Sequence, residues 1–423
     1  MIALKKFFEG VVMMVDVVLI GLRGYGAQFF REYVQRAEQG KVRIVGAVNR
    51  SAPEGETKKD MERLGIPYFS SLDAFYREKS ADLVNISSPI QYHCEQTCLS
   101  LKHGSHVLCE KPTAATVEEV MKMIDCRDAY RRNVLIGYQW AFSDAIQALK
   151  KDILQGKFGK PLRLKTVVLW PRNDDYYARG WAGKIKDASG RWVLDSVAAN
   201  ATAHFLQNMF YVLGESLEKS ALPQYVIAET YRANRIENFD TAAIRAYTER
   251  GTELLFLASH AVHTRDVYGP VFEYEFEEAV IHFRDEQNRF QKNGKQDEIT
   301  AVYRDGREVH YGSPFDNPFH KIDVALEAVQ KDEPFVPCGL ETASAQTLCI
   351  HGVHESVPQP VSFAEDVIRY DGADRIVWVD GLVEAFKQCY AEWKMPHELG
   401  CDWARRGREV NLSSNALYKR MIE

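Results

Sequence analysis

The chain has 423 residues, which is too long for a single ordinary domain and predicts two domains, each large enough to bury a core. Its formal net charge of −6 gives no electrostatic case for a nucleic-acid or membrane-surface partner. No segment reaches the roughly 18 uninterrupted apolar residues of a membrane span. We therefore expect a cytoplasmic protein that binds neither nucleic acid nor membrane.

The N-terminus does not form a convincing signal peptide, because Glu9 and Asp16 interrupt its apolar run and no small-residue cleavage site follows. Met14 directly precedes the first predicted strand and is a candidate start, in which case residues 1–13 are an extension. The eight cysteines form no C-x-x-C pair, and we interpret them as reduced intracellular thiols. We expect no metal site.

The segment from residue 15 to 51 is typical of the βαβ unit that opens a dinucleotide-binding fold: an apolar strand, a glycine turn, an amphipathic helix and a second apolar strand. The turn departs from a strict G-x-G-x-x-G because Arg23 occupies the middle position. It nevertheless opens a predicted helix, whose free backbone N–H groups can hold a pyrophosphate. The predicted phosphate-binding residues are Gly21, Arg23, Gly24, Tyr25 and Gly26.

The second strand, 42–48, ends at Asn49, Arg50 and Ser51, where an NAD-specific site usually has a carboxylate for the ribose 2′-hydroxyl. A guanidinium and a hydroxyl suit a 2′-phosphate instead, since both donate hydrogen bonds to it. We therefore expect NADP to be preferred over NAD. The alternative is that Arg50 is a solvated cation for which nearby glutamates compete.

The stretch 82–112 is again strand, helix and strand, and it ends on the unusual triplet Glu110-Lys111-Pro112. The triplet follows a predicted strand directly, at the carboxyl edge of the sheet, where α/β proteins bind their ligands. A lysine there can polarise a substrate hydroxyl or take part in proton transfer. A surface turn is the alternative interpretation.

Strand patterns divide the chain near residue 140. The first part predicts six strands in the order 3-2-1-4-5-6, at 15–20, 42–48, 66–69, 82–87, 105–109 and 134–138. After a predicted helix at 144–155, the second part predicts an antiparallel sheet, with strands at 162–170, 224–233, 239–248, 252–260, 271–276, 279–284 and 299–303. Helical patterns return from Pro318, and we expect these helices to pack back across the first domain.

Four motifs together resemble the glucose-fructose oxidoreductase/inositol dehydrogenase/rhizopine catabolism (Gfo/Idh/MocA) family: the glycine turn, Pro89 to His93, the Glu-Lys-Pro triplet, and Asn200 to His204. The motifs extend to about residue 215, and the later resemblance lies in the order of elements. The family implies an α/β protein with a Rossmann domain, 14–140. It also implies a C-terminal α/β domain, 141–423, with a large, mostly antiparallel open sheet.

The resemblance also implies roles for residues. Lys111 would face the nicotinamide and the substrate, and the Lys111–Pro112 peptide bond becomes a candidate for the cis form. The family's second signature has an aspartate four residues before a histidine, and here the two positions hold Asn200 and His204. Asp195, further upstream, is more typical of a helix cap, with Ser196 as the competing cap.

We expect Lys111, His204 and Asn200 to be catalytic, with a neutral His204 accepting the hydroxyl proton and Lys111 assisting. A histidine buried in the core is the alternative for His204. The resemblance further places His93 near the cofactor, and the cofactor set is completed by Ser88, Pro89, Glu110 and Lys111. Gln139 and Trp140 replace a pair that commonly ends in arginine.

The loop from residue 170 to 184 is dense in aromatic and charged groups, which suits a polyol or a sugar. A packed loop or a subunit contact is the alternative. The predicted substrate-binding residues are Gln139, Trp140, Arg172, Tyr176, Tyr177 and Trp181.

The family resemblance predicts an NAD(P)-dependent oxidoreductase that transfers a hydride between the nicotinamide and a secondary hydroxyl of a sugar, cyclitol or related polyol. Because sheets of this family often pair through their open face, we expect a homo-oligomer, a dimer or a tetramer. Two other functions stay open: a redox-assisted glycoside hydrolase that uses bound NAD(P), and a non-catalytic nucleotide sensor.

Overall fold

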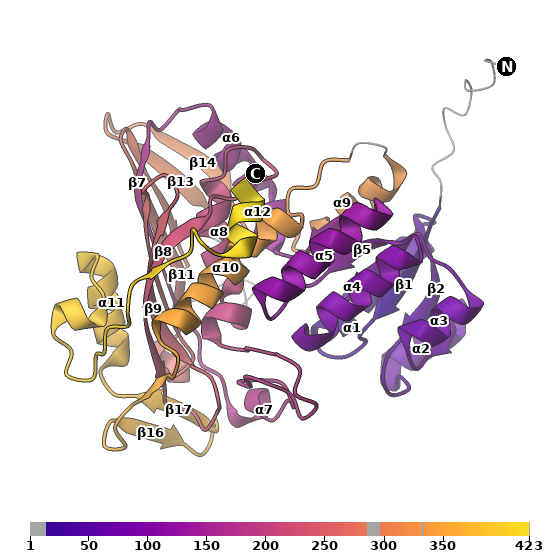
Figure 1. Ribbon diagram of the computed structural model, residues 1–423, viewed down its shortest axis with the longest axis horizontal. Coiled ribbons are helices and arrows are strands. Elements are labelled where there is room, and N and C mark those ends of the chain that lie inside the picture. The colour runs from indigo at the N-terminus through magenta and orange to yellow at the C-terminus, as the bar shows by residue number, and fades with distance from the viewer. Residues whose placement is uncertain (1–13, 286–296, 332–333, 423) are drawn as a thin grey trace.

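The computed structural model describes residues 14–285, 297–331 and 334–422. The candidate extension 1–13 lies outside the described residues. Figure 1 shows two sheets with helices between them, and the chain enters the second sheet only after the first is complete. None of the helices in these ranges is long and apolar enough to cross a membrane.

The first sheet has six parallel strands in the order β3-β2-β1-β4-β5-β6, which confirms the predicted order. Its central strands are buried on both faces, as the unbroken apolar runs of the sequence require. The strands are β1 Val15–Ile20, β2 Val42–Val48, β3 Tyr68–Phe69, β4 Leu83–Ile86, β5 His106–Cys109 and β6 Val134–Ile136. The helices are α1 Tyr25–Glu38, α2 Gly55–Leu64, α3 Leu72–Glu78, α4 His93–Lys102 and α5 Val117–Tyr130.

The turn between β1 and α1 depends on two of its glycines. A Cβ atom on Gly21 would lie 2.6 Å from the carbonyl oxygen of Ser87, and a Cβ on Gly26 would lie 2.1 Å from that of Gly21. The turn therefore packs directly on the end of β4. The middle position, held by Arg23, is exposed, so a side chain is accommodated there. This explains why the imperfect fingerprint still forms the expected turn.

The second sheet has ten strands and is mostly antiparallel, as predicted. Two pairs, β7 with β10 and β8 with β15, are parallel, and the strand patterns alone did not indicate them. The strands are β7 Pro161–Leu169, β8 Pro223–Arg232, β9 Thr241–Thr248, β10 Glu253–Ser259, β11 Tyr268–Phe276, β12 Ala279–Arg284, β13 Ile299–Tyr303, β14 Glu308–Gly312, β15 Val361–Ser362 and β18 Val410–Asn411.

Helices cover the inner face of this sheet and connect it to the first. α10 contacts both β8 and α5, α9 contacts the ends of β4 and β5, and α12 contacts α5. Figure 1 shows α10 between the large sheet and the helices of the first. The bounds are α6 Asp144–Leu154, α7 Asp174–Tyr177, α8 Ala203–Val212, α9 His320–Gln330, α10 Leu340–Ser356 and α12 Ala416–Ile422.

The outer face carries a second apolar cluster, which residues 361–403 cover. We call this segment the outer cap. It contains the hairpin β16 Ile368–Asp371 and β17 Ile376–Val379, and the helix α11 Leu382–Glu392, which lies in Figure 1 on the opposite side of the sheet from α8 and α10. Phe386 of α11 is fully buried against Val167 and Leu255 and their neighbours.

On β11 and β12 the outer face carries charged and polar side chains, and Tyr390 and Trp393 of the outer cap lie over Lys165. Glu273 pairs with Lys165 at 3.1 Å and lies 3.6 Å from His282, and Glu275 pairs with Arg163. The outer cap thus buries part of the outer face within one chain. The homo-oligomer stays a prediction.

Replacing Phe386 with alanine will destabilise the protein by about 3 to 5 kcal/mol, because it leaves a cavity beneath α11. The measurement is the free energy of unfolding in denaturant. Gln388→Ala, on the exposed side of the same helix, will change it little. Equal effects of the two substitutions would show that α11 is not docked on the sheet.

Candidate active site

The carboxyl end of β5 carries the Glu-Lys-Pro triplet to the place where the two sheets meet. The predicted cis peptide bond between Lys111 and Pro112 is present. The Lys111 ammonium donates hydrogen bonds to the backbone carbonyl of Asn200, at 2.8 Å, and to its side-chain Oδ1, at 2.6 Å. Two of the three N–H bonds of the ammonium are thereby used, and one position remains for a ligand.

Burial lowers the pKa of Lys111 to about 8, although Glu110 and Asp195 raise it. Its direct partner is a neutral amide, which cannot compensate the charge as a carboxylate would. Lys111 is therefore predominantly charged at neutral pH and loses its proton at a mildly alkaline pH.

Asp195 binds the end of the Asn200 amide that does not contact Lys111. Its Oδ1 accepts a hydrogen bond of 2.8 Å from Nδ2 of Asn200, and its Oδ2 accepts one of 2.6 Å from the backbone N–H of Gly183. The predicted capping role of Asp195 is wrong, because Ser196 is the cap: its Oγ accepts from the backbone N–H of Ala199. Burial raises the pKa of Asp195 to about 6.

His204 lies one turn further on, at the start of α8. Asn200 itself lies in the π-helical turn Val197–Ala201, just before α8, and its side chain bonds Lys111 and Asp195 rather than the imidazole. Among the described residues, the buried Nδ1 of His204 has no hydrogen-bond partner. Burial first, and then the charges of Lys111 and Lys321, lower its pKa well below the usual value, so His204 is neutral.

Lys321, at the start of α9, is a site residue that was not predicted from the sequence. It is fully buried, and its ammonium lies 2.5 Å from Oε1 of Glu110, 3.2 Å from the carbonyl oxygen of Gly137 and 3.5 Å from the hydroxyl of Tyr25. Burial lowers its pKa, but Glu110 and Tyr25 together raise it above the usual value. The available signal was a lysine beside Ile322 on the apolar face of a predicted helix.

Glu110 therefore does not face a cofactor freely, since one of its oxygens is held by Lys321. Gly137 allows this approach: a Cβ atom there would lie 2.4 Å from Oε1 of Glu110. The pair joins the end of β5 to α9, which follows it by some two hundred residues in the chain. Glu110 is better described as an anchor of the site than as a cofactor ligand.

The predicted phosphate-binding turn is open. Arg23, Gly24 and Tyr25 are exposed at the N-terminus of α1, which has no side-chain cap and no acidic residue in its first turn. These backbone N–H groups can hold a pyrophosphate. Gly21 packs closely on Ser87 and Gly26 packs closely on Gly21, and no side chain of these two residues takes up space at the turn. The turn fits a dinucleotide cofactor.

At the end of β2, Arg50 and Ser51 are exposed, and Asn49 bonds the backbone of the glycine turn through Leu22 and its own loop through Ser51. Within the described ranges Arg50 forms no ion pair, and Glu56 pairs with Lys59 instead. An exposed Arg50, unpaired in the described part of the chain, agrees both with the alternative of a solvated cation and with a ligand for a 2′-phosphate.

His93 needs a correction. It is 1% exposed, and its two ring nitrogens lie 2.9 Å from the backbone carbonyls of Pro112 and Ser88. Both nitrogens are occupied by backbone, so neither can bind the cofactor. His93 instead fixes the loop that begins at Ser88 and Pro89 to the loop that follows Lys111. Ser88 in turn bonds Gln96 at 2.6 Å.

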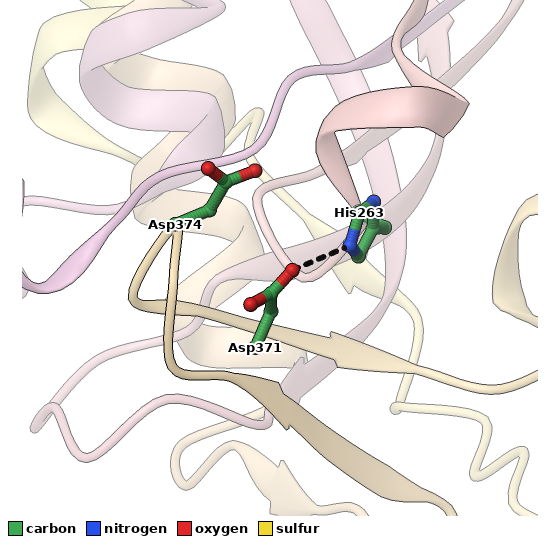
Figure 2. A group of neighbouring side chains, drawn as sticks. All are labelled: His263, Asp371 and Asp374. Atoms are coloured by element: carbon green, nitrogen blue, oxygen red, sulfur yellow. Dashed lines mark hydrogen bonds and ion pairs between the residues drawn. The ribbon is translucent and has the colours of Figure 1, made fainter.

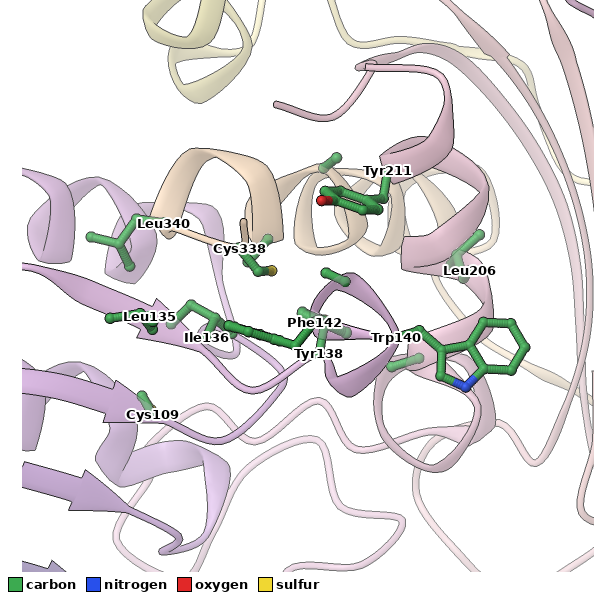
Figure 3. Packing of buried hydrophobic residues seen from close by; sticks show 14 of the residues in the cluster. Cys109, Leu135, Ile136, Tyr138, Trp140, Phe142, Leu206, Tyr211, Cys338 and Leu340 are labelled. Atoms are coloured by element: carbon green, nitrogen blue, oxygen red, sulfur yellow. The ribbon is translucent and has the colours of Figure 1, made fainter. Parts of the chain in front are cut away.

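Trp140 also needs a correction, because it cannot contact a substrate. It is 1% exposed, and Figure 3 shows it inside the buried cluster beside Leu206. The neighbouring Gln139 is half-buried and accepts a long bond of 3.4 Å from the hydroxyl of Tyr25. The rings that surround Trp140 are Phe205, Phe272, Phe283 and Phe315.

The aromatic loop places four predicted substrate residues around one another. The guanidinium of Arg172 lies 5.1 Å from the ring centre of Tyr176, whose ring meets those of Tyr177 and Trp181 edge to face. In the described part of the chain, Arg172 forms no ion pair with an acid, and the buried hydroxyl of Tyr177 has no partner. These groups can bind a hydroxyl or a carboxylate.

A further cluster, His263, Asp371 and Asp374, has the residue types of a metal site (Figure 2). Its own hydrogen bonds explain it. Nδ1 of His263 accepts from the backbone N–H of Arg265, so the proton sits on Nε2, which lies 3.2 Å from Asp371. Asp374 accepts from the hydroxyl of Thr264 at 2.8 Å. The cluster ties the outer cap to the end of β10.

Comparison with known proteins identifies the first part of the chain. Residues 15–138 match the GFO_IDH_MocA model, described as an oxidoreductase family with an NAD-binding Rossmann fold. These residues are similar to the Gfo/Idh/MocA oxidoreductase family. The family resemblance and an NAD-binding Rossmann fold are thus confirmed.

Relatives of this family align with only part of the chain. A 1,5-anhydro-D-fructose reductase of Ensifer adhaerens is 28% identical over 39% of this chain and 49% of its own length. An inositol 2-dehydrogenase of Azotobacter vinelandii is 25% identical over 53% of this chain and 66% of its own. The chain thus spans about half of the first of these relatives and about two thirds of the second.

Solved structures extend the likeness in fold to both sheets. The WlbA dehydrogenase of Bordetella pertussis, in complex with NADH and UDP-GlcNAcA, is 19% identical with a TM-score of 0.63, over 83% of this chain and 100% of its own. An aldose–aldose oxidoreductase of Caulobacter crescentus, complexed with glycerol, is 18% identical with a TM-score of 0.64, over 81% and 97%. At this identity the likeness concerns the fold alone.

Replacing Lys321 with alanine will cost about 3 to 5 kcal/mol of folding free energy, because it leaves the Glu110 carboxylate buried without its partner. Denaturant unfolding measures this cost. Lys331→Ala, which removes an exposed pair with Glu327 at the end of the same helix, is the matched control and will change stability little. If the two variants were equally stable, the buried pair would contribute nothing to the fold.

Proposed function

We propose that the protein is an NAD(P)-dependent oxidoreductase that transfers a hydride between the nicotinamide and a secondary hydroxyl of a sugar, cyclitol or related polyol. The observation that carries this proposal is the arrangement at the end of β5. There, Lys111 keeps one N–H position for a ligand, and the neutral His204 has an unpartnered Nδ1 in the described structure. Cytoplasmic location and homo-oligomer formation stay predictions.

The dinucleotide would be held by the N-terminus of α1 and by the loop after β2, and when bound it supplies the hydride acceptor or donor. For alcohol oxidation, the hydroxyl proton must leave as the hydride departs. The neutral imidazole of His204 accepts that proton, and the remaining position of Lys111 polarises the hydroxyl oxygen. Arg172 and the tyrosines of the aromatic loop orient the rest of the substrate.

The activity test is the absorbance of reduced nicotinamide when the protein meets NADP+ or NAD+ with a panel of sugars, inositols and sugar acids. Turnover will appear with at least one of these compounds, and Lys111→Ala will lower kcat by about 100-fold or more, because the hydroxyl oxygen loses the positioned ammonium that polarises it. Lys157→Ala, which removes an exposed lysine between α6 and β7, is the control.

His204→Ala will reduce turnover similarly while cofactor binding, followed by fluorescence, is retained. Silence of the wild-type protein across the whole panel despite tight cofactor binding would contradict net oxidoreduction. It would favour the glycoside hydrolase, tested by release of the aglycone from a glycoside panel, or the nucleotide sensor.

We further infer that NADP is preferred over NAD, because the end of β2 lacks an acid and presents Arg50, unpaired within the described ranges, beside Ser51. Arg50→Ala will weaken NADP binding about 10-fold or more, since a charge-assisted hydrogen bond to the 2′-phosphate is lost. NAD binding will change little. Titration calorimetry with both dinucleotides measures the difference.

Arg43→Ala is the matched control, because Arg43 lies on the same strand but pairs with Asp16 at the opposite end. An equal loss of NADP and NAD affinity in Arg50→Ala would overturn the inference and indicate a contact common to both cofactors.

A further inference from the structure

The carboxylate nearest to Asn200 belongs to Asp195, five residues earlier in the chain. We propose that Asp195 is a positioning residue for Lys111: it holds the Asn200 amide in the single orientation that presents an oxygen to the lysine. This inference rests on the proposed function, because it assigns Lys111 its working geometry. It is carried by hydrogen bonds among buried groups.

An asparagine side chain has two ends of similar shape and opposite hydrogen-bonding character. With Oδ1 toward Lys111 and Nδ2 toward Asp195, both contacts join a donor to an acceptor, at 2.6 and 2.8 Å. In the reversed orientation the NH₂ group would face the ammonium, and the amide oxygen would face the carboxylate. Both contacts would then be repulsive, so the ionised Asp195 selects one orientation.

Asp195 is itself held rigidly. It is 2% exposed, and its second oxygen accepts from the backbone N–H of Gly183 at 2.6 Å. The charged groups that act on it are Lys111 and Arg172, both of which favour its ionised form against burial. The phenols of Tyr176 and Tyr177 also lie within its electrostatic reach.

The orientation of the Asn200 amide determines the direction of the third N–H bond of the Lys111 ammonium. Two N–H bonds point to the backbone oxygen and the side-chain oxygen of Asn200, so the remaining proton of the ammonium has a fixed direction. When that proton leaves, the lone pair takes the same direction. Lys111 thus presents either one donor or one acceptor to a substrate hydroxyl, and a neutral amide keeps both forms accessible.

Asp195→Asn tests this geometry without changing the size of the side chain. The new amide can keep the bond from Gly183 through its oxygen, and its NH₂ group then faces Asn200. The Asn200 amide must therefore turn its oxygen toward position 195 and its own NH₂ group toward Lys111. We expect the pKa of Lys111 to fall by about one unit, because a donor replaces an acceptor beside the ammonium and the Asp195 charge that raises this pKa is lost.

Adding Asn200→Asp to this variant again pairs a donor with an acceptor in both contacts, the one between positions 195 and 200 and the one between position 200 and Lys111. The amide at position 195 donates to one oxygen of the new carboxylate, and the other oxygen accepts from Lys111. The pKa of Lys111 will rise above its wild-type value in the double variant, because a carboxylate replaces a neutral amide as its direct partner. Asp187→Asn, in an exposed turn of the same loop, is the control and will leave it unchanged.

The primary measurement is an NMR titration of Lys111 with ¹³C-labelled lysine, assigned by the signal that Lys111→Ala removes, on the full-length protein without substrate. Because it needs no turnover, it tests the inference even if no substrate is found. A fall in Asp195→Asn and a rise in the double variant support the proposal. An unchanged Lys111 pKa in both variants, with unfolding midpoints near wild type, overturns it.

Where a substrate is found, the pH profile of kcat supplies a second reading. Asp195→Asn will lower kcat about 10-fold or more with little change in KM, its alkaline limb will move with the Lys111 pKa, and the double variant will recover kcat. Loss of kcat in Asp195→Asn without a shift of that limb and without recovery would mean a merely structural role, and would overturn the proposal.

Discussion

Two neighbouring residues, Glu110 and Lys111, hold the two parts of the molecule together. Glu110 binds Lys321 at the start of α9, whereas Lys111 binds Asn200 just before α8. Asn200 lies between β7 and β8, and Lys321 lies between β14 and β15, so both partners come from connections of the second sheet. The site therefore depends on the packing of the two sheets against each other.

The electrostatics of these contacts explain why two buried lysines behave differently. Lys321 meets a carboxylate directly, which keeps it charged and makes it a fixed part of the structure. Lys111 meets a neutral amide, so burial prevails and its pKa is lowered. A charge is expensive to bury unless it is paired, and a lysine that is only partly compensated is the one that can exchange a proton.

Much of the fold follows from patterns along the chain, and much of the site does not. The strands of the first sheet and their order are predictable because buried parallel strands are unbroken apolar runs. The Glu-Lys-Pro triplet is visible because it follows such a strand. Lys321 is not visible, since a single lysine in a helical pattern does not reveal a partner two hundred residues earlier. Asp195 was assigned to a cap because local spacing cannot show a contact made through another side chain.

The errors share one physical cause. Trp140 was expected at the substrate because it stands at the end of a strand, yet its ring is enclosed by the aromatic residues of the second sheet. His93 was expected at the cofactor, yet two backbone carbonyls occupy its nitrogens. Position along the chain places a residue at the edge of a sheet, but the surrounding packing decides whether its side chain faces a ligand or the core.

Packing within the chain also determines which side chains are covered on the outer face of the second sheet. Helix α11 of the outer cap buries an apolar part of the outer face, and the rings of Tyr390 and Trp393 also cover Lys165, which pairs with Glu273. This part of the outer face is therefore packed within the chain, as the inner face is packed against α8 and α10.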